Sequence, residues 1–222
     1  MTSYRSREQY SQGGQDVYVT RILSEKRDGY FVEAGAYDGF TISNTFLLEK
    51  NYNWKGICIE ATPYRIQDLK NNRPNAICIE SAVFSESNLE LDFTTTSIDF
   101  LNVITEYSEI SADFLNQNGQ IIKVRTKTIT DILNENNAPE NIDYLSIDTN
   151  GSEHKVLEGI DFTKYNFNVI TVKNSSIIER QDRIKEILTS NGYSKQQTVM
   201  MVDNISDDLY VPNSTYIEDH VY

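Results

Sequence analysis

Short apolar runs alternate along the chain with stretches in which apolar residues recur at helical spacing. The apolar runs predict core strands at residues 30–32, 55–59, 76–84, 142–148 and 167–173. The periodic stretches predict helices at residues 15–26, 41–50, 63–72, 129–135, 152–159 and 179–190. Such alternation is typical of a parallel sheet with helices on both faces. We therefore expect a doubly wound α/β fold with a mostly parallel sheet of about seven strands.

Two further runs, residues 89–94 and 121–128, alternate apolar and polar side chains and predict additional strands. The polar residues 97–120 between them lack a clean period and predict a loop or short-helix insertion that covers the site. Residues 197–202 and 208–211 predict a closing antiparallel hairpin.

The two ends of the chain complete this organisation. Residues 1–28 predict an entry segment with one helix, and residues 212–222 predict a tail. No linker and no internal repeat interrupts the pattern, so we expect a single domain over residues 1–222.

The stretch from residue 30 to residue 60 predicts a ligand as well as a fold. Glu33 and Glu60 close its two strands, and Gly35 and Gly39 bracket the turn between the first strand and the helix. Glycines let the backbone adopt positive φ and let a ligand approach closely, and the helix start presents free N–H groups. An acid at the tip of the second strand accepts hydrogen bonds from ribose hydroxyls. This unit predicts a nucleoside site, against the alternative of an ordinary turn that needs glycine only for its conformation.

The same turn indicates which nucleoside fits. It lacks the G-x-G-x-x-G pattern, and Ala36, Tyr37 and Asp38 fill the space that a pyrophosphate would need. Glu33 adds a carboxylate that would repel phosphates. A ligand with an ammonium group and no phosphate, such as S-adenosylmethionine, is therefore favoured over the dinucleotide of a nicotinamide-dependent oxidoreductase.

A second group of polar residues follows the strand at residues 142–148. Asp148 ends this strand, and ligands of doubly wound sheets bind outside such carboxyl ends, so we expect it in one crevice with Glu33 and Glu60. The alternative is a cap or turn role for Asp148. Lys173 ends the next strand and should lie near Asp148. It either pairs with that carboxylate, or orients or deprotonates a substrate hydroxyl if its pKa is lowered.

Two more candidates stand in the first turn of the helix after Asp148. Glu153 carries a carboxylate that is favourable at a helix start, which is a structural explanation for its presence. His154 is a candidate base, and the competing expectation is a histidine that faces solvent.

Composition excludes several classes of function. The 222 residues carry a net charge of −13, which disfavours a sequence-independent grip on nucleic acid and docking on anionic membranes. No signal core and no run of roughly 18 apolar residues is present, so we expect a cytoplasmic protein without a membrane span. Cys58 and Cys78 lie within apolar strands and predict small buried side chains, and His154 and His220 are too few for a multi-histidine metal site. We expect no metal.

These motifs together resemble the FkbM-type methyltransferases, which use S-adenosylmethionine and have the class I methyltransferase, Rossmann-like fold. The resemblance covers most of the chain and rests on residues 11–16, 31–39, 43–45, 54–60, 81–83, 142–148, 151–153, 156–162 and 207–211. Members typically methylate hydroxyl oxygens, often on sugars of glycans or natural products.

The resemblance implies a role for each matching position. Residues 33–37 would line the methionine end of the cofactor, Glu60 would hold the ribose hydroxyls, and residues 81–83 would border the adenine. Gln15 and Asp16 would approach from the N-terminal segment. The expected cofactor-binding residues are Gln15, Glu33, Gly35, Ala36, Tyr37, Asp38, Gly39, Asn44, Glu60, Ala61, Ser81, Ala82, Val83 and Asp148. The candidate catalytic residues are Asp148, Glu153, His154 and Lys173.

Two positions depart from the family pattern. After Asp148 the family usually shows Thr-Glu-Gly, and here Asn150 replaces the acid. At the end of the next strand it usually shows Glu-His-Asn, and here the residues are Lys173, Asn174 and Ser175. Two acids and a histidine are thus missing from the expected catalytic wall, whereas the cofactor motifs are intact.

Three hypotheses follow. The first is O-methyl transfer to a hydroxyl of a sugar or small molecule, with Asp148 positioning or accepting the proton and Lys173 or His154 as alternatives. The second is a catalytically degenerate member that binds the cofactor and acts as a partner-binding protein. The third is an RNA 2′-O-methyltransferase, which the pairing of Asp148 with Lys173 suggests and the net charge disfavours.

Overall fold

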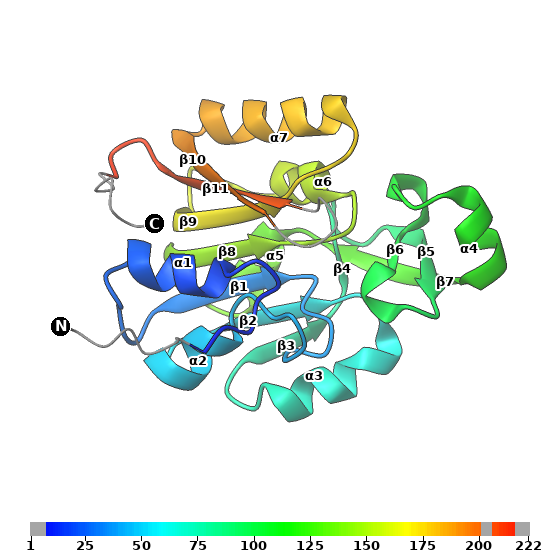
Figure 1. Ribbon diagram of the computed structural model, residues 1–222, viewed down its shortest axis with the longest axis horizontal. Helices are drawn as coiled ribbons and strands as arrows, with labels where there is room; N and C mark the ends of the chain where they lie inside the picture. The colour runs from blue at the N-terminus through cyan, green and yellow to red at the C-terminus, as the bar shows by residue number, and fades with distance from the viewer. Residues whose placement is uncertain (1–7, 201–205, 216–222) are drawn as a thin grey trace.

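The computed structural model describes residues 8–200 and 206–215, and seven of the strands form one sheet (Figure 1). From edge to edge these are β3 (Ile77–Glu80), β2 (Lys55–Glu60), β1 (Tyr30–Ala34), β8 (Asn141–Ile147), β9 (Asn166–Lys173), β11 (Ser206–Pro212) and β10 (Tyr193–Met200). The first five run parallel, and β11 is antiparallel to both of its neighbours. The mostly parallel sheet and the closing hairpin are therefore confirmed.

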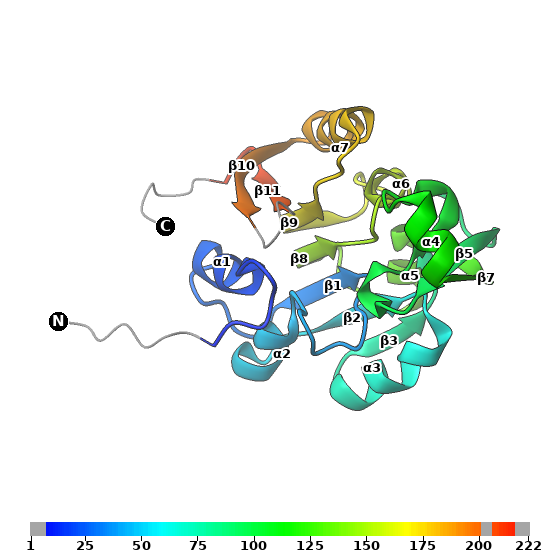
Figure 2. The same ribbon diagram turned by 45° about the vertical axis from the view of Figure 1, so that its right-hand side comes forward.

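A second sheet of four strands lies beyond the carboxyl end of β1 (Figures 1 and 2). Its order is β4 (Ala82–Val83), β7 (Gly119–Lys127), β5 (Glu90–Thr96) and β6 (Val103–Ile104). The strands β5 and β7 were predicted, but their separate sheet was not. The predicted strand 76–84 is wrong as a single element, because β3 stays in the main sheet and β4 pairs with β7.

The predicted insertion at residues 97–120 contains short elements that pack on the second sheet. They are η2 (Asp99–Leu101), β6, η3 (Thr105–Tyr107) and α4 (Ala112–Asn118). β6 pairs with β5 through Phe93 and Ile104, and Phe93, Ile104 and Val124 form a small apolar core there.

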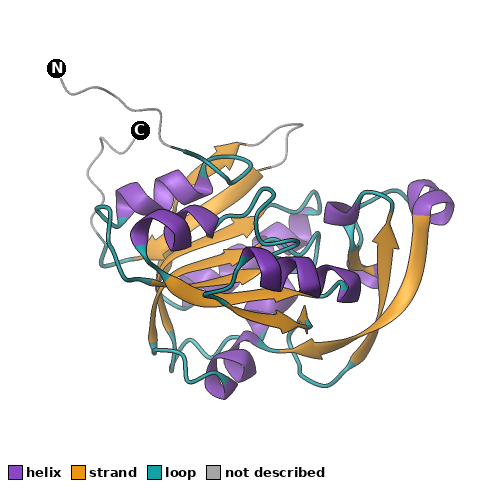
Figure 3. Ribbon diagram, turned by 90° about the horizontal axis from the view of Figure 1, so that it is seen from below, coloured by secondary structure: helices purple, strands orange, loops and turns teal. Residues whose placement is uncertain are grey.

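Helices cover both faces of the main sheet (Figure 3). They are α1 (Gln15–Ile22), α2 (Phe46–Tyr52), η1 (Pro63–Arg65), α3 (Ile66–Asn72), α5 (Ile129–Glu135), α6 (Glu153–Glu158) and α7 (Ile178–Ser190). Successive residues of a strand point to opposite faces. Accordingly, Val32 packs in one core with side chains of α5, α6 and α7, and Phe31 packs in the other with side chains of α1, α2 and α3. None of the described helices is long and apolar enough to cross a membrane.

Two helices are shorter than predicted. α1 ends at Ile22 rather than at residue 26, because Ser24 and Glu25 adopt positive φ of 50° and 56°. α2 begins at Phe46 rather than at residue 41, because a turn precedes it in which Asp38 accepts hydrogen bonds from the following N–H groups. Part of the predicted hairpin strand 197–202 and part of the tail 212–222 lie outside the described residues.

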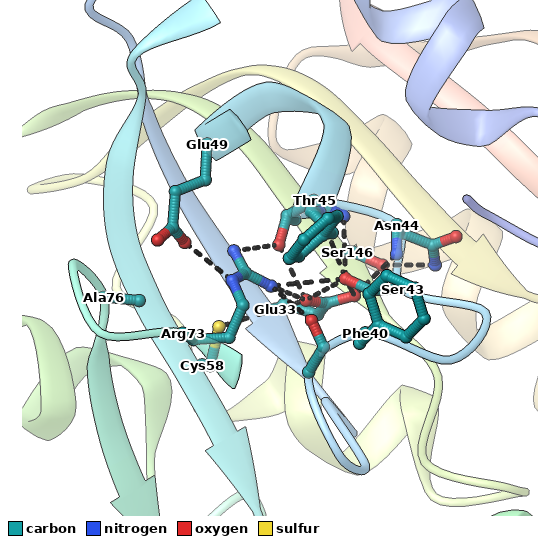
Figure 4. A network of polar contacts seen from close by, with 12 residues as sticks. Glu33, Phe40, Ser43, Asn44, Thr45, Glu49, Cys58, Arg73, Ala76 and Ser146 are labelled. Atoms are coloured by element: carbon teal, nitrogen blue, oxygen red, sulfur yellow. Dashed lines mark hydrogen bonds and ion pairs between the residues drawn. The ribbon is translucent and has the colours of Figure 1, made fainter. Parts of the chain in front are cut away.

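A buried ion-pair network ties β1 to α2 and to the end of α3 (Figure 4). The Arg73 guanidinium is fully buried and contacts the carboxylates of Glu49 at 2.6 Å and Glu33 at 3.3 Å. Glu33 also accepts hydrogen bonds from the Asn44 N–H and the Thr45 hydroxyl, both at 2.7 Å. Removing one member would leave a charge buried without its partner. The network therefore holds the loop before α2 against the end of β1.

Close contact between two strand ends explains one glycine of the turn after β1. Gly35 has a φ of +85°, and a Cβ there would lie 1.8 Å from the Asp148 carbonyl oxygen. The sequence predicted that this glycine lets a ligand approach the turn. The structure shows that it lets the backbone at Asp148, just after β8, approach closely.

Gly35→Ala should destabilise the protein by well over about 2 kcal/mol, because a steric clash adds to the strain of positive φ. Gly192 offers a matched control, since its φ is also +85° and no atom lies within 4 Å of an added Cβ. Gly192→Ala should cost only the strain, roughly 1 kcal/mol. Urea unfolding of both variants measures the difference, and equal losses would contradict the clash.

A buried carboxyl joins the N-terminal helix to the last strand. Gln15, the first residue of α1, donates a hydrogen bond from Nε2 to Asp207 Oδ2 at 2.9 Å. Asp207 is 1% exposed, and it lies opposite Lys173 in the register of β11 and β9. Burial, with the charge of nearby Asp148, raises the pKa of the Asp207 carboxyl to about 7.

This raised pKa predicts how stability depends on pH. In the unfolded chain the carboxyl returns to a pKa near 3.8, so the folded state holds the proton longer as pH rises. The contribution is fully present below the unfolded pKa and is lost as pH rises through about 7. From near pH 5.5 to near pH 8 the wild type should lose about 2 kcal/mol that Asp207→Asn does not lose. Urea unfolding at both pH values tests this, and parallel losses in the two proteins would refute it.

Candidate active site

A cleft with an empty volume of about 790 Å³, open solvent included, lies beyond the carboxyl ends of β1, β2, β3 and β8. Ligands of doubly wound sheets bind outside such strand ends. The predicted cofactor residues that line it are Glu33, Gly35, Ala36, Tyr37, Asn44, Glu60, Ala61, Ser81, Ala82, Val83 and Asp148. The structure thus brings together residues that are far apart in the sequence, because adjacent parallel strands end at one edge of the sheet.

Three predicted residues lie outside this lining. Asp38 turns its carboxylate to the N–H groups of Phe40 and Thr41, and so shapes the loop. Gly39 packs against Arg73, whose Cγ would lie 2.5 Å from an added Cβ. Gln15 is directed to Asp207 instead. Their contacts support the loop and the site edge.

Glu60 is held in one orientation at the end of β2. Its Oε1 accepts a hydrogen bond from the Thr62 N–H at 2.7 Å, and its Oε2 accepts one from the Tyr37 N–H at 2.8 Å. Burial raises the pKa of this carboxyl. Each carboxylate oxygen has two lone pairs, so Glu60 retains acceptor capacity for hydroxyl groups of a ligand.

Asn44 carries a buried acceptor that the described residues leave unused. Its Nδ2 donates to the Ser146 hydroxyl at 2.8 Å, whereas its Oδ1 has no hydrogen-bond partner in the described part of the chain. Leaving such a group unsatisfied costs about 1–3 kcal/mol. Because Asn44 lines the cleft, a donor on a bound ligand, such as an ammonium group, would satisfy it.

The structure refines one argument about Glu33. Its carboxylate lines the cleft, but it shares the Arg73 guanidinium with Glu49, and three side-chain or backbone groups of residues 43–45 donate to it. The negative charge that would repel phosphates is therefore partly balanced, and it is weaker than that of an unpaired carboxylate. The unused acceptor of Asn44 is the better reason for a ligand with an ammonium group.

At the end of β8, Asp148 forms an ion pair with Lys173. The Lys173 Nζ lies 2.8 Å from Asp148 Oδ1 and 2.6 Å from Asn150 Oδ1. Burial lowers the pKa of Lys173, but the Asp148 carboxylate outweighs this and the net change is upward. The ion pair between Lys173 and Asp148 is confirmed. The alternative prediction, a lysine base with a lowered pKa, is wrong.

The other two catalytic candidates are turned away from the cleft lining. Glu153 is buried and accepts hydrogen bonds from the N–H groups of Thr149 and Gly151, so it holds the turn after β8. His154 is 8% exposed and lies 5.5 Å from the Tyr107 ring, so the expectation that it faces solvent is wrong. Burial lowers its pKa. Of the four candidates, Asp148 lines the cleft.

The individual residues of one cleft wall were not assigned from the sequence, which predicted only that the insertion at residues 97–120 covers the site. This wall is made by the second sheet and the connection before β6, with Phe93, Phe100, Asn102 and Ile104 in the lining. The alternation in residues 89–94 indicated a strand, but nothing local indicated which side chains of residues 97–104 would turn to the cleft. β6 is only two residues long, and its pairing with β5 decides their placement.

Comparisons with known proteins agree with this geometry. The family model of the methyltransferase FkbM domain matches residues 33–195. A comparison with curated proteins finds no match. The N-terminal domain of human METTL16 is similar in structure, with a TM-score of 0.52 and 11% identity over 92% of this chain and 69% of that chain.

Two further solved structures show weaker likeness. Precorrin-6y C5,15-methyltransferase of Geobacter metallireducens has a TM-score of 0.49 and 11% identity, over 94% of this chain and 92% of that chain. Aeropyrum pernix fibrillarin was solved with natively bound S-adenosyl-L-methionine. It has a TM-score of 0.49 and 12% identity, over 89% of this chain and 76% of that chain.

The fold and the family model lead to one assignment. The seven-stranded sheet with its antiparallel β11 between β9 and β10 is the class I methyltransferase fold. The matched residues include the turn after β1, the ends of β2 and β8, and the lysine end of β9. The chain belongs to the FkbM methyltransferase family.

Proposed function

We propose that this protein is an S-adenosylmethionine-dependent O-methyltransferase that acts on a hydroxyl of a sugar or small molecule. The observation that carries the proposal is one cleft that combines an oriented carboxylate at Glu60, an unused acceptor at Asn44 and the ion-paired Asp148. Methyl transfer needs a cofactor held by its ribose and amino acid ends, and a group that takes the hydroxyl proton.

The hydrogen-bond acceptors of the cleft fit this cofactor. Glu60 would accept hydrogen bonds from the ribose hydroxyls, and Asn44 Oδ1 would accept one from the ammonium group. Ser81, Ala82 and Val83 would border the adenine. The bound cofactor supplies an electrophilic methyl group on a sulfonium.

The protein would contribute orientation and proton acceptance. The cleft would orient an acceptor hydroxyl toward the bound cofactor, which would supply the methyl group and leave as S-adenosylhomocysteine, and the Asp148 carboxylate would accept the hydroxyl proton. The Lys173 ammonium fixes that carboxylate in place, because its Nζ lies 2.8 Å from Oδ1, and the net upward change in the pKa of Lys173 keeps the lysine protonated. Lys173 therefore positions the acid and does not itself take the proton.

A cofactor-binding member without turnover is the second candidate. The observation that favours it is the cation of Lys173 in the place where the family usually shows an acid. An RNA 2′-O-methyltransferase shares the pairing of lysine with aspartate, and the net charge of −13 counts against a long phosphate backbone as substrate.

The first prediction for this function concerns Glu60. S-adenosylhomocysteine should bind the wild type with micromolar affinity, and Glu60→Gln should weaken it about tenfold, because charge-assisted hydrogen bonds are lost. Glu80 is the matched control, since it ends the adjacent strand opposite Glu60 but is exposed and outside the cleft lining. Calorimetric titration of the three proteins provides the measurement. An absence of binding at millimolar ligand would refute the proposed cofactor.

The second prediction concerns Asp148. Its replacement in Asp148→Asn should reduce turnover by about 100-fold or more while the cofactor still binds, because the proton acceptor is lost. Release of S-adenosylhomocysteine with a panel of sugars, phenols and capped RNA measures turnover, and Asp182→Asn in α7 serves as the control. Turnover with RNA alone would favour the third hypothesis. Cofactor binding without turnover on any acceptor would favour the degenerate member.

A further inference from the structure

The side chain of Asn150 uses both ends of its amide. Its Oδ1 accepts a hydrogen bond from Lys173 at 2.6 Å, and its Nδ2 donates to the carbonyl oxygens of Phe100 and Asn102, each at 2.9 Å. A carboxylate could accept from Lys173 but could not donate to the two carbonyls. The amide at this position is therefore required by its neighbours.

These two carbonyls belong to residues 98–104, which we call the wall segment because Phe100, Asn102 and Ile104 line the cleft. The wall segment is also held on its other side. Asn102 Nδ2 donates to the Thr62 hydroxyl at 3.1 Å and to the Tyr64 hydroxyl at 3.2 Å. The wall segment is thus fastened to the turn after β8 by Asn150 and to the turn after β2 by Asn102.

Each of these two sets of hydrogen bonds leads to a residue that we assign to cofactor binding or to proton transfer. Asn150 contacts Lys173, which holds the Asp148 carboxylate. On the other side, Thr62 donates its N–H to Glu60, the proposed ribose ligand. The polar contacts therefore form one chain from the reaction end of the cleft, through the wall segment, to the ribose end.

We propose that Asn150 is a positioning residue that couples closure of the cofactor cleft to the placement of the Asp148–Lys173 pair. The proposal rests on the proposed function, and it goes beyond it by giving a role to a position that departs from the family pattern. Asn150 keeps the wall segment against the bound cofactor and restrains the Lys173 ammonium beside Asp148. The amide thus replaces the usual acid with a connection that an ionised carboxylate cannot make.

The test variant is Asn150→Asp, which keeps the size of the side chain and the acceptor for Lys173 but loses both donors. Binding of S-adenosylhomocysteine should weaken about tenfold or more, because two carbonyls lose their partner. Amide hydrogen exchange of residues 98–104 should become faster in the free protein. Asn136→Asp is the matched control, because its amide also donates to a backbone carbonyl, of Ile132 at 2.8 Å, away from the cleft lining.

A split between affinity and turnover separates this role from a general loss of structure. Asn150→Asp keeps an acceptor for Lys173, so turnover at saturating cofactor should stay near the wild-type value while cofactor affinity falls. Asn150→Ala loses that acceptor as well as both donors, so it should lower turnover in addition.

The possible results distinguish a failure of the role proposed for Asn150 from a failure of the proposed methyltransferase function. Wild-type-like affinity and exchange in Asn150→Asp would overturn the coupling, even if the wild type binds the cofactor. A wild type that does not bind S-adenosylhomocysteine would overturn the proposed function, whereas faster exchange of residues 98–104 in the free variant would still show that Asn150 fastens the wall segment.

Discussion

The buried contact of Arg73 with Glu33 and Glu49 is the constraint on which the cofactor side of the cleft depends. Charges inside a protein are tolerated only when they are paired and hydrogen-bonded. Here the pairing joins the end of β1, α2 and the end of α3, and the loop between β1 and α2 closes over it. The loop residues that line the cleft are therefore placed by a network beneath them, and Glu33 acts first as part of that support.

The main sheet could be predicted because its signals are local. Apolar runs such as residues 142–148 and glycine turns such as Gly35 each indicate an element without reference to distant residues. The second sheet could not be predicted in the same way. β4 and β6 are each two residues long and too short to show a period, and Ala82 of β4 pairs with the distant Thr126 of β7. Whether residues 97–120 act as a lid, and whether residues 1–222 form a single domain, remain predictions.

In the candidate site, too, some features could be predicted from local sequence signals and others could not. Strand-end residues such as Glu60 and Asp148 were placed correctly at the cleft, because parallel strands end together. Protonation and side-chain direction depend on three-dimensional neighbours. The Asp148 carboxylate raises the pKa of Lys173 against the effect of burial, and burial lowers the pKa of His154. The departure at Asn150 looked like a loss in the sequence, and its three hydrogen bonds show a different use of the position.

The contact between Gly35 and the Asp148 carbonyl has a consequence for how this protein can change over generations. An added methyl group would overlap that carbonyl, so the turn after β1 and the end of β8 stay in close contact. Substitutions cannot change the spacing between them without a cost in stability. Changes in the shape of the cleft are accommodated more readily by the opposite wall, through the side chains of Phe93, Phe100 and Ile104. Even in that wall, the Asn102 side chain and the carbonyls of residues 100 and 102 are held by hydrogen bonds, so the part of the cleft that can vary is narrow.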